Sequence, residues 1–580
     1  MQTPNVIDKV SRAVTRNDQL KREKTVWNEH WQLLGEYIHM RKQNFTSTQQ
    51  DGDFLSKELF DNTASKSNNT MASSLIGMLW PNGAKSFRLA PPSGIKETSE
   101  VKRYYEFVTA RMAEAMDDPK AGLATALDEY MKDQGCFGTS GIEIMPGRKD
   151  SDLSYKAWSV KEMSIDEGRD GFVDSIFIEI EWTLRQAALE YGLEKLSEKS
   201  RELIKNGKLD DKIKILIAIE PRLEFTPGME GNRNMPFQSL HIELSEKNLL
   251  REAGFEDLPL KVGRFWKILK EKYGRSPGME ALPDVLELNA IWESITVAIE
   301  KMLDPPLGIL DDGRLGGGTI DTSAGAINVF NITGRAGERQ PVFPLYTVGE
   351  LQHVGTLIDK LTESISNHFF IDRLLDLNNE NEMTLGEAQI RNKLRGGTLG
   401  SIFARQIAEV FDPLIERTFN VLFKAGKLGV APNSLEHFMK QLDGEDPVLI
   451  PDEIVEFMKN GRDAYKIKYI TPAARIMDAE EAQGIVQTWE LAGTMCAVNQ
   501  EVIDNLDADE SIKRFALISG APSTILRAKG DVDTIRKARQ DALAQAQQLQ
   551  AAKAGAGAAK DAAQAQKTAQ ETKQMAGIAA

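Results

Sequence analysis

One long amphipathic segment, Met383–Leu428, constrains the fold more than any other part of the chain. It opens with Thr384 and Glu387, whose spacing is typical of a capping box at the start of a helix. Apolar residues then recur at intervals of three and four as far as Gly426, a residue that favours the end of a helix. About forty residues at 1.5 Å each form a helix on the order of 60 Å long. Such a rod suits an architectural role better than a catalytic pocket.

The same segment contains residues that disfavour a straight helix. Pro413 lacks a backbone N–H, and glycines stand at positions 396, 397 and 400. Proline and clustered glycines are the usual causes of helix kinks. We therefore expect the rod to bend or be interrupted at these points.

Bulk composition indicates a folded chain with several domains and narrows its partners. The 580 residues are 41% hydrophobic, which is enough for sizeable cores. A net charge of −15 disfavours tight adhesion to nucleic acid, whose phosphates attract Lys and Arg. The two cysteines, Cys136 and Cys496, are far apart, so we expect no disulfide framework and a reducing compartment of assembly. The polar start of the sequence predicts no signal peptide, and no apolar run reaches the length of a membrane span.

The first half of the chain is predicted to pass from helices into an α+β unit. The antiparallel strands of that unit surround a charged helical excursion at 183–206, and Asp170-Gly171 is a strong hairpin-turn signal. The expected helices lie at 1–45, 62–80, 100–116 and 123–134, an extended piece at 86–89, and strands at 141–144, 175–182 and 212–219.

The second half alternates helices with a small insert that favours β structure. Pro277 stands where a first helical turn tolerates proline, and Pro305-Pro306 ends that helix. A glycine-rich insert with two strand candidates, 326–332 and 340–343, leads to a helix over 348–370 and a polar loop at 377–382. After the rod we expect an extended piece at 465–472, short helices over 473–530, and an Ala/Gln-rich tail whose residues favour a helix. This tail has little apolar surface to bury, so we expect it to fray or be disordered unless neighbours hold it.

No residue pattern predicts catalysis, a metal site or a cofactor. The sequence from Gly313 to Thr319 is glycine-rich but lacks the lysine of a phosphate-binding loop. None of the six histidines has a His or Cys partner at zinc-ligand spacing, and no G-x-S-x-G motif occurs. Paired acids such as Asp311-Asp312 are ordinary solvated surface in a chain of this charge. We therefore expect no catalytic residues.

Two polar sets are candidates for contacts rather than chemistry. The glycine-rich insert carries Arg314, Arg335 and Arg339, which are either a solvated loop or a charged surface for a partner. The loop before the rod is either a surface turn or a lining of a channel. Its candidate residues are Asn378, Asn379, Glu380, Asn381 and Arg373.

The order of these blocks resembles the portal, or head-to-tail connector, proteins of short-tailed double-stranded DNA bacteriophages. Leu385-Gly386 and Ala473 depart from the residues usual at their positions in that family. The likeness spans nearly the whole chain in the expected order. It is carried by Asn62–Leu89, Asp128–Pro146, Tyr273–Ile309, Met383–Leu428, Tyr469–Arg475 and Val502–Arg539.

The resemblance implies a predominantly helical α+β fold with wing, stem, clip and crown, whose subunits form a ring, usually a dodecamer. Ring contacts of this kind are heterologous and close by rotation. The expected parts are a wing at 1–275, stem helices at 276–304 and 347–370, a clip at 305–346, a channel loop at 371–383, a long wing or tunnel helix at 384–428, a wing return at 429–476, a crown at 477–537 and the tail at 538–580.

The resemblance also implies a function at one capsid vertex, the head-to-tail junction of the virion, after assembly in the host cytoplasm. The ring is a channel through which double-stranded DNA is packaged and ejected. It docks the large terminase subunit and later tail adaptor proteins, contacts major capsid or scaffolding proteins, and has no membrane partner. Two alternatives stay open: a nuclease or ATPase of the packaging machinery, and an internal virion protein without a channel.

Overall fold

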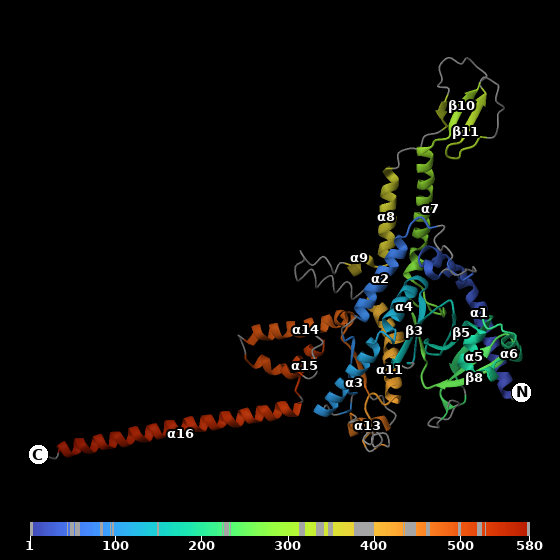
Figure 1. Cartoon of the computed structure of the whole chain (residues 1–580). Helices are drawn as coiled ribbons and strands as arrows, with labels where there is room; N and C mark the ends of the chain where they lie inside the picture. Colours follow the sequence, from blue (N-terminus) through green and yellow to red (C-terminus); the bar gives the residue numbers. More distant parts are fainter. Residues whose placement is uncertain are drawn as a thin grey trace. The chain divides into compact units, whose positions relative to one another are not determined.

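The chain forms two compact units in a computed structural model (Figure 1). Unit 1 comprises Met1–Arg88, Val108–Val430 and Ile467–Gly484, and unit 2 comprises Leu89–Phe107, Ala431–Lys466 and Ile485–Ala580. The structure describes residues 4–42, 44–46, 52, 59–81, 85–92, 94–95, 98–147, 150–222, 224, 231, 234–311, 320–331, 342–345, 352–375, 399–432, 434, 448–459, 465–496, 500–518, 525–527 and 529–576.

The predicted N-terminal helices are confirmed. The arm is one helix of 34 residues, whose Trp31 packs in an aromatic cluster with Trp27, Phe45 and Tyr273. Trp31 Nε1 donates to Phe137 O over 3.1 Å, so the arm is bound by a polar contact as well as by packing. The helices are α1 (Pro4–Tyr37), α2 (Thr63–Leu79), α3 (Ser99–Asp117) and α4 (Leu123–Phe137).

A five-stranded antiparallel sheet is the largest β element of unit 1. Its strand order is β4-β5-β6-β7-β8, and the hairpin between β4 and β5 turns at Gly171, whose φ of 76° is the left-handed value predicted by Asp170-Gly171. The strands are β4 (Met163–Glu167), β5 (Val173–Thr183), β6 (Lys212–Pro221), β7 (Phe237–Glu243) and β8 (Asn248–Phe255).

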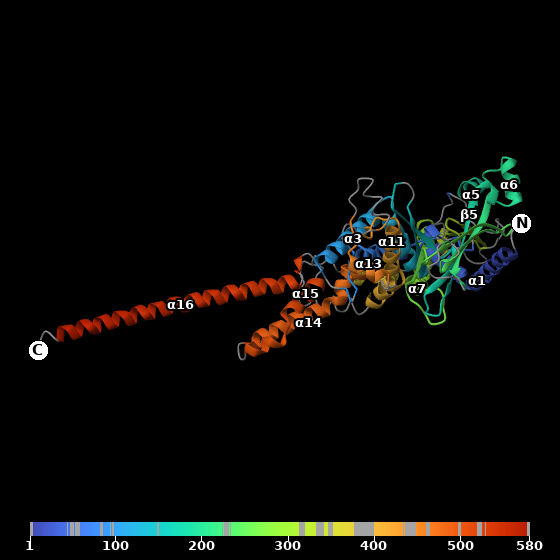
Figure 2. The same cartoon turned by 90° about the horizontal axis from the view of Figure 1, so that it is seen from below.

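Helices cover both faces of this sheet, as Figure 2 shows. Alternation along β6 sends Leu216 and Ala218 toward Val10 and Val14 of α1. It sends Ile213 and Ile215 to the opposite face, toward α5 (Leu184–Tyr191) and α6 (Glu198–Lys205). The charged excursion predicted at 183–206 is therefore helical, and its apolar side closes the second face of the sheet.

The sequence did not predict the strands between residues 225 and 275. Besides β7 and β8, β9 (Leu260–Arg264) pairs with β2 (Thr139–Pro146), which also pairs with β3 (Leu153–Ser159). These segments mix charged residues with short apolar runs, so they lack the strict alternation that marks a half-buried strand.

The described part of the predicted rod is helical from residue 399 to 424, and its predicted end at Gly426 is confirmed by a φ of 65°. Pro413 does not break the helix. Instead a π turn, Ile407–Phe411, precedes it, and Asp412 N–H donates to Ile407 O, five residues back. The helix continues as α11 (Asp412–Lys424). The Thr384–Glu387 capping box and the glycines at 396 and 397 lie outside the described residues.

The π turn carries a buried carboxylate to a buried arginine of β9. Glu409 accepts hydrogen bonds from Arg264 Nη2 at 2.9 Å, Arg264 Nε at 3.3 Å and the Arg264 backbone N–H at 2.8 Å. The same guanidinium also bonds to Glu167 and to Gly171 O at the β4–β5 hairpin. One side chain thus joins the helix, β9 and the hairpin.

Unit 2 is mostly helical. The strand β13 (Lys466–Tyr469), at the predicted extended piece, belongs to unit 1 from Ile467 onward and pairs with β1 (Phe87–Ala90). The Ala/Gln-rich tail belongs to one continuous helix of 48 residues, in agreement with the helix propensities of Ala, Gln and Lys. The remaining elements are α13 (Asp452–Lys459), α14 (Pro472–Cys496), the 3-10 helix η7 (Gln500–Asn505), α15 (Ala508–Ile518) and α16 (Lys529–Ala576).

Replacing Arg264 with methionine should lower the free energy of unfolding of unit 1 by about 3–5 kcal/mol, because the buried carboxylate of Glu409 would lose the guanidinium and keep its longer ion pair with Arg405, at 3.5 Å. Chemical denaturation followed by tryptophan fluorescence measures this. The matched control is Arg12→Met, which removes an ion pair with Glu220 from an exposed arginine and should cost less than about 1 kcal/mol. Equal losses in the two variants would contradict the role assigned to Arg264.

A half-buried histidine makes the five-stranded sheet sensitive to acid. Burial, with the nearby Arg251, lowers the pKa of His241 to about 4, and its Nδ1 lies 2.8 Å from the Tyr191 hydroxyl. The unfolded chain, with a histidine pKa of about 6.5, binds the proton more readily, so stability should fall as pH drops from about 6.5 to 4. In His241→Gln this loss should be smaller by about 1–3 kcal/mol, measured by urea unfolding across that range. Identical pH profiles for both proteins would refute this assignment.

Candidate functional site

A helical hairpin that extends from unit 1 and ends in a small sheet is the candidate site (Figure 1). Its first helix, α7 (Pro277–Leu303), matches the stem helix predicted at 276–304. Ser276 caps it by accepting from Met279 N–H at 3.1 Å, and the Ser276 hydroxyl donates to Cys136 O at 2.7 Å. The base of the helix is therefore anchored to the end of α4.

The second helix of the hairpin, α8 (Gln352–His368), packs beside the base of α7. Ser364 Oγ donates to Asp284 at 2.6 Å, and His368 lies 3.7 Å from the same carboxylate. Ile365 and Phe369 are fully buried there. These contacts fix α8 to the base of α7.

The outer half of α7 has no buried residue, although it is rich in apolar side chains. Every buried residue of the helix lies at or before Asn289. Beyond that point Ile299 is 44% exposed, Met302 55% and Leu303 82%. Apolar groups on a helix normally face a core, so this surface lacks the partner that its composition requires.

The outer half of α7 carries three parallel stripes. Ile291, Ile295, Ala298 and Met302 repeat at the spacing of one helix face. A second apolar stripe, turned by about 100°, holds Trp292, Ile299 and Leu303. The third, turned by about a further 100°, contains the acidic residues Glu293, Glu300 and Asp304.

The stripes differ in exposure. Ile291, Ile295 and Ala298 of the first stripe are half-buried, whereas Ile299 and Leu303 of the second are exposed. The acidic stripe lies nearly opposite the first. The outer half of α7 is thus apolar on two adjacent faces and acidic on a third.

The insert between the stem helices is a three-stranded sheet. β11 (Ile327–Asn331) and β12 (Val342–Pro344) lie at the two predicted strands, but the central strand, β10 (Leu307–Asp311), was not predicted. β10 pairs parallel with β11 and antiparallel with β12. Two prolines precede β10 and it contains a glycine. Both residue types are unusual in strands, so the sequence did not indicate this one. Large apolar side chains are exposed here too: Ile320, Ile327 and Val342.

The predicted contact residues are largely outside the described part of the chain. This applies to Arg314, Arg335 and Arg339 of the insert and to the polar loop residues Asn378, Asn379, Glu380 and Asn381. Arg373 is described, and it does not lie in a loop. The range 371–383, predicted as a loop, begins with the short helix α9 (Ile371–Leu375).

Arg373 packs locally. Its guanidinium lies 5.9 Å from the centre of the Phe370 ring and 3.9 Å from Asp372. Phe370 has a φ of 58°, which lets the chain turn from α8 into α9. Because the Arg373 side chain stays exposed, it is available to solvent at the base of the stem.

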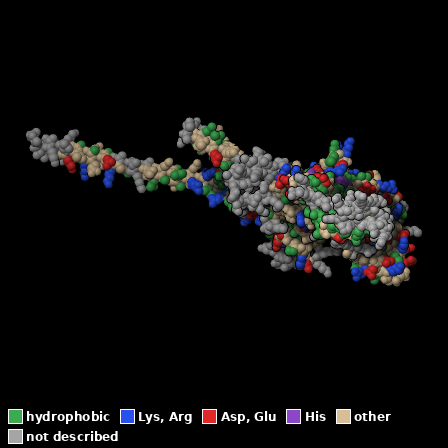
Figure 3. Space-filling view, turned by 90° about the horizontal axis from the view of Figure 1, so that it is seen from above, with side chains coloured by type: hydrophobic (Ala, Val, Ile, Leu, Met, Phe, Trp, Pro, Cys, Tyr) green, Lys and Arg blue, Asp and Glu red, His purple; other side chains and the backbone are tan. Residues whose placement is uncertain are grey.

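The titratable side chains of the described residues offer no candidate metal cluster. In the described ranges, His, Cys, Asp and Glu side chains nowhere gather in threes at metal-binding distance, and none of the helices there has the length and apolarity of a membrane span. Burial raises the pKa of the Cys136 thiol well above its ordinary value. Figure 3 shows acidic and basic side chains intermixed over the described surface of unit 1.

Sequence analysis predicted the helix α7 but not its acidic and apolar stripes, although their spacing was visible in the sequence. The acids at 293, 300 and 304 share one helix face, and the apolar residues at 292, 299 and 303 share the next. What the sequence could not supply is the fact that α8 covers only part of this helix.

Comparison with known proteins identifies the family. The family model described as "Bacteriophage head to tail connecting protein" matches residues 10–526. The probable portal protein of Bordetella phage BPP-1 is 25% identical over 541 residues, which cover 92% of this chain and 92% of that protein. The portal protein of Salmonella phage epsilon15 is 26% identical over 564 residues, covering 96% and 94%.

Two solved structures from gene transfer agent particles, one of the native virion and one of the neck of the empty particle, cover 67% of this chain. Their identities are 12% and 11%, and their TM-scores of 0.29 and 0.32 are too low to support an argument. The family match spans most of the sequence. The chain belongs to the family of bacteriophage head-to-tail connecting proteins.

Proposed function

We propose that this chain is the subunit of a phage portal, a closed ring through which the genome enters and leaves the capsid. Membership of the connector family and the names of the two phage relatives support this function. The observation that carries the ring is the outer half of α7, which is apolar on two faces and has no buried residue.

A ring supplies the partner that this helix lacks. In a ring each subunit has two neighbours, so a stripe left exposed by α8 is covered by the next copy through a heterologous contact. Burying a side chain the size of Leu303 contributes about 1.5–3 kcal/mol, and every subunit repeats the contact. A closed ring forms all of these contacts together, so their contributions to stability are cooperative. The subunit number we propose is that of a dodecamer.

The acidic stripe gives the ring a lumen suited to DNA. If the second apolar stripe faces the neighbouring copy, Glu293, Glu300 and Asp304 lie on a different face of the stem and are free to line the axis. Carboxylates repel phosphates and release no condensed counterions, so a duplex can slide without adhering. The polar residues Asn378, Asn379, Glu380 and Asn381 of the loop are proposed to narrow the same channel, with Arg373 as a cationic exception at the base of the stem.

The sheet at the end of the stem is proposed as the clip that receives partners. Its exposed Ile320, Ile327 and Val342 favour protein contacts, and Arg314, Arg335 and Arg339 are proposed to add charge to that surface. The terminase motor would dock there during filling and a tail adaptor afterwards. The wing would contact capsid or scaffolding protein, and the crown at 477–537 and the tail would belong to the capsid side of a virion assembled in the host cytoplasm.

The proposed role involves no bond making or breaking by this chain. Every observation that supports it concerns packing, charge and passive transport. Energy for DNA movement would come from the motor protein, and the portal would act as conduit and docking platform.

The substitution Leu303→Glu should prevent ring closure. It places a charge at an apolar contact that each subunit makes with its neighbour, so native mass spectrometry should find small oligomers where the wild type gives closed rings. Leu189→Glu on α5 is the matched control, because Leu189 is 83% exposed and Leu303 82%. Rings of wild-type mass in the Leu303 variant would count against this interface.

Charge reversal of the acidic stripe should make the channel adhere to DNA. Rings of Glu293→Lys/Glu300→Lys should assemble normally but bind a duplex about tenfold more tightly at low salt, an effect lost at high salt. Fluorescence anisotropy measures the binding, and in vitro packaging should slow in parallel. The double variant Glu194→Lys/Glu202→Lys changes exposed acids near α6 by the same charge and should leave both unchanged. Equal DNA binding by both variants would argue against a luminal stripe.

A further inference from the structure

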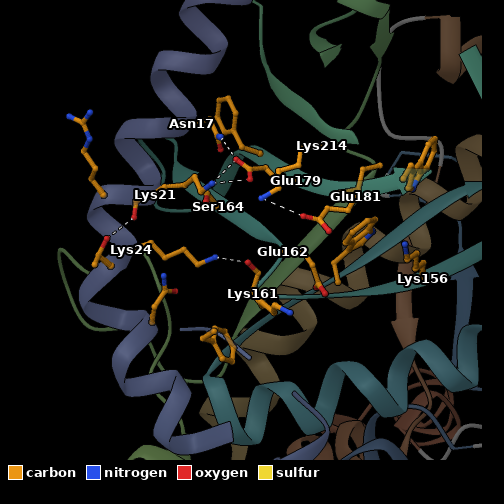
Figure 4. Close-up of a pocket in the computed structure, with 18 residues that line it drawn as sticks. Asn17, Lys21, Lys24, Lys156, Lys161, Glu162, Ser164, Glu179, Glu181 and Lys214 are labelled. Carbon is orange, nitrogen blue, oxygen red and sulfur yellow. Dashed lines mark hydrogen bonds and ion pairs between the residues drawn. The ribbon is translucent and has the colours of Figure 1, made fainter. Parts of the chain in front are cut away.

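A basic cavity lies between the N-terminal arm and the five-stranded sheet, far along the chain from the stem (Figure 4). Its volume is about 890 Å³. α1 forms one wall, the β3–β4 connection a second, and β5 with β6 the floor. It is entirely within unit 1.

The charge of this cavity is opposite to that of the chain. Six basic side chains and three carboxylates line it, in a protein whose net charge is −15. Two of the cations are already paired, Lys21 with Glu179 at 2.8 Å and Lys214 with Glu181 at 3.4 Å. Lys156 and Lys161 form no ion pair among the described residues, so their charges are available to an anionic ligand.

A buried lysine keeps the wall of the cavity in place. Lys24 of α1 is 5% exposed and its Nζ donates to three backbone carbonyls, those of Val160, Lys161 and Met163. All three donors of the ammonium group are therefore used. Lys24 fixes the arm against the β3–β4 connection and gives the cavity a preformed shape.

The floor of the cavity includes an open strand edge. β4 begins at Met163, opposite Ile178, and the last contact on that side is Glu179 N–H to Glu162 O at 3.1 Å. β5 continues to Thr183, paired with β6 only. Because backbone direction alternates along a strand, Glu179 C=O and both backbone groups of Glu181 point away from β6. They have no strand partner in the described part of the chain.

An aromatic ring lies beside these cations. Trp158 donates from Nε1 to Glu143 at 2.9 Å, and Lys156 Nζ lies 3.7 Å from the centre of its ring. Trp158 is itself buried, so it supports Lys156 from below. Trp182, at the end of β5, instead stacks on Tyr191 of α5 on the opposite face of the sheet.

We propose that this cavity binds an extended acidic peptide segment of another protein, which adds to the open edge of β5. The alternating donor and acceptor groups at Glu179 and Glu181 match a peptide backbone, as in β-strand addition. Lys156 and Lys161 match acidic side chains of such a segment. A nucleic acid fits poorly, because its backbone has no alternating amide donors and carbonyl acceptors to pair with the open edge of β5.

A selection with a random ten-residue peptide display library on the full-length protein tests the proposal, with counter-selection on Lys156→Glu/Lys161→Glu. Acidic sequences with alternating apolar residues should be enriched. The most enriched peptide, labelled with fluorescein, should bind at least about tenfold more weakly to the double variant in fluorescence anisotropy. Lys199→Glu/Lys208→Glu, with the same charge change on exposed lysines outside the cavity, should bind like the wild type.

A second probe separates strand addition from charge attraction alone. The same peptide with alternate backbone nitrogens methylated keeps its charge but loses its donors, and it should bind at least about tenfold more weakly. Three outcomes would each overturn the proposal. The selection could fail to enrich acidic peptides, or the methylated peptide could bind as tightly as the original one. The third is a 20-base-pair duplex that binds more tightly than the peptide and loses this binding in the double variant. Ring assembly should be unchanged in all these variants, so the outcome is independent of the portal function proposed above.

Discussion

The contact between Arg264 and Glu409 holds together segments that are far apart in the sequence. A buried ion pair stabilises a fold only when its geometry offsets the loss of hydration, and here both carboxylate oxygens and the arginine backbone take part. Gly263 permits this approach, because a Cβ there would lie 2.0 Å from the Tyr130 hydroxyl and 2.6 Å from Val410. That hydroxyl donates to Gln406 at 2.5 Å, so α4, β9 and the long helix share one buried polar network. The position of the helix relative to the sheets depends on it.

Local chemistry explains what could be predicted from the sequence. Helices such as α2 and α7 were predictable because apolar periodicity, a capping residue and a proline or glycine at the end agree with one another. The hairpin at Gly171 followed from a two-residue turn signal. In contrast, β9 is fully buried, including Lys261 and Arg264, and so its sequence does not alternate. The acidic partners of Arg264, Glu167 and Glu409, lie 97 and 145 residues away along the chain.

The candidate site likewise has features that could be predicted from the sequence and features that could not. The boundaries of α7 could be predicted from the sequence. Which of its stripes are exposed could not, because this required knowing that no residue of α7 beyond Asn289 is buried. The cavity beside α1 had no sequence signal, because its lysines come from a helix, a loop and two strands. Residues gathered from separate elements become a site only through the fold. Both surfaces are also incomplete in one chain, the stem for lack of apolar cover and the edge of β5 for lack of a backbone partner.

The π turn at Ile407–Phe411 has a consequence for the rotational phase of the helix before it. A π turn is equivalent to one residue inserted into an α-helix. Without that residue, the α-helical segment 399–406 would rotate by about 100° relative to α11 and shift by about 1.5 Å along the helix axis. Leu399, Phe403 and Gln406, now buried, would leave the interior. A single inserted residue therefore sets the direction in which everything upstream on that helix faces, and lineages that gain or lose one there must rebuild a whole helix face.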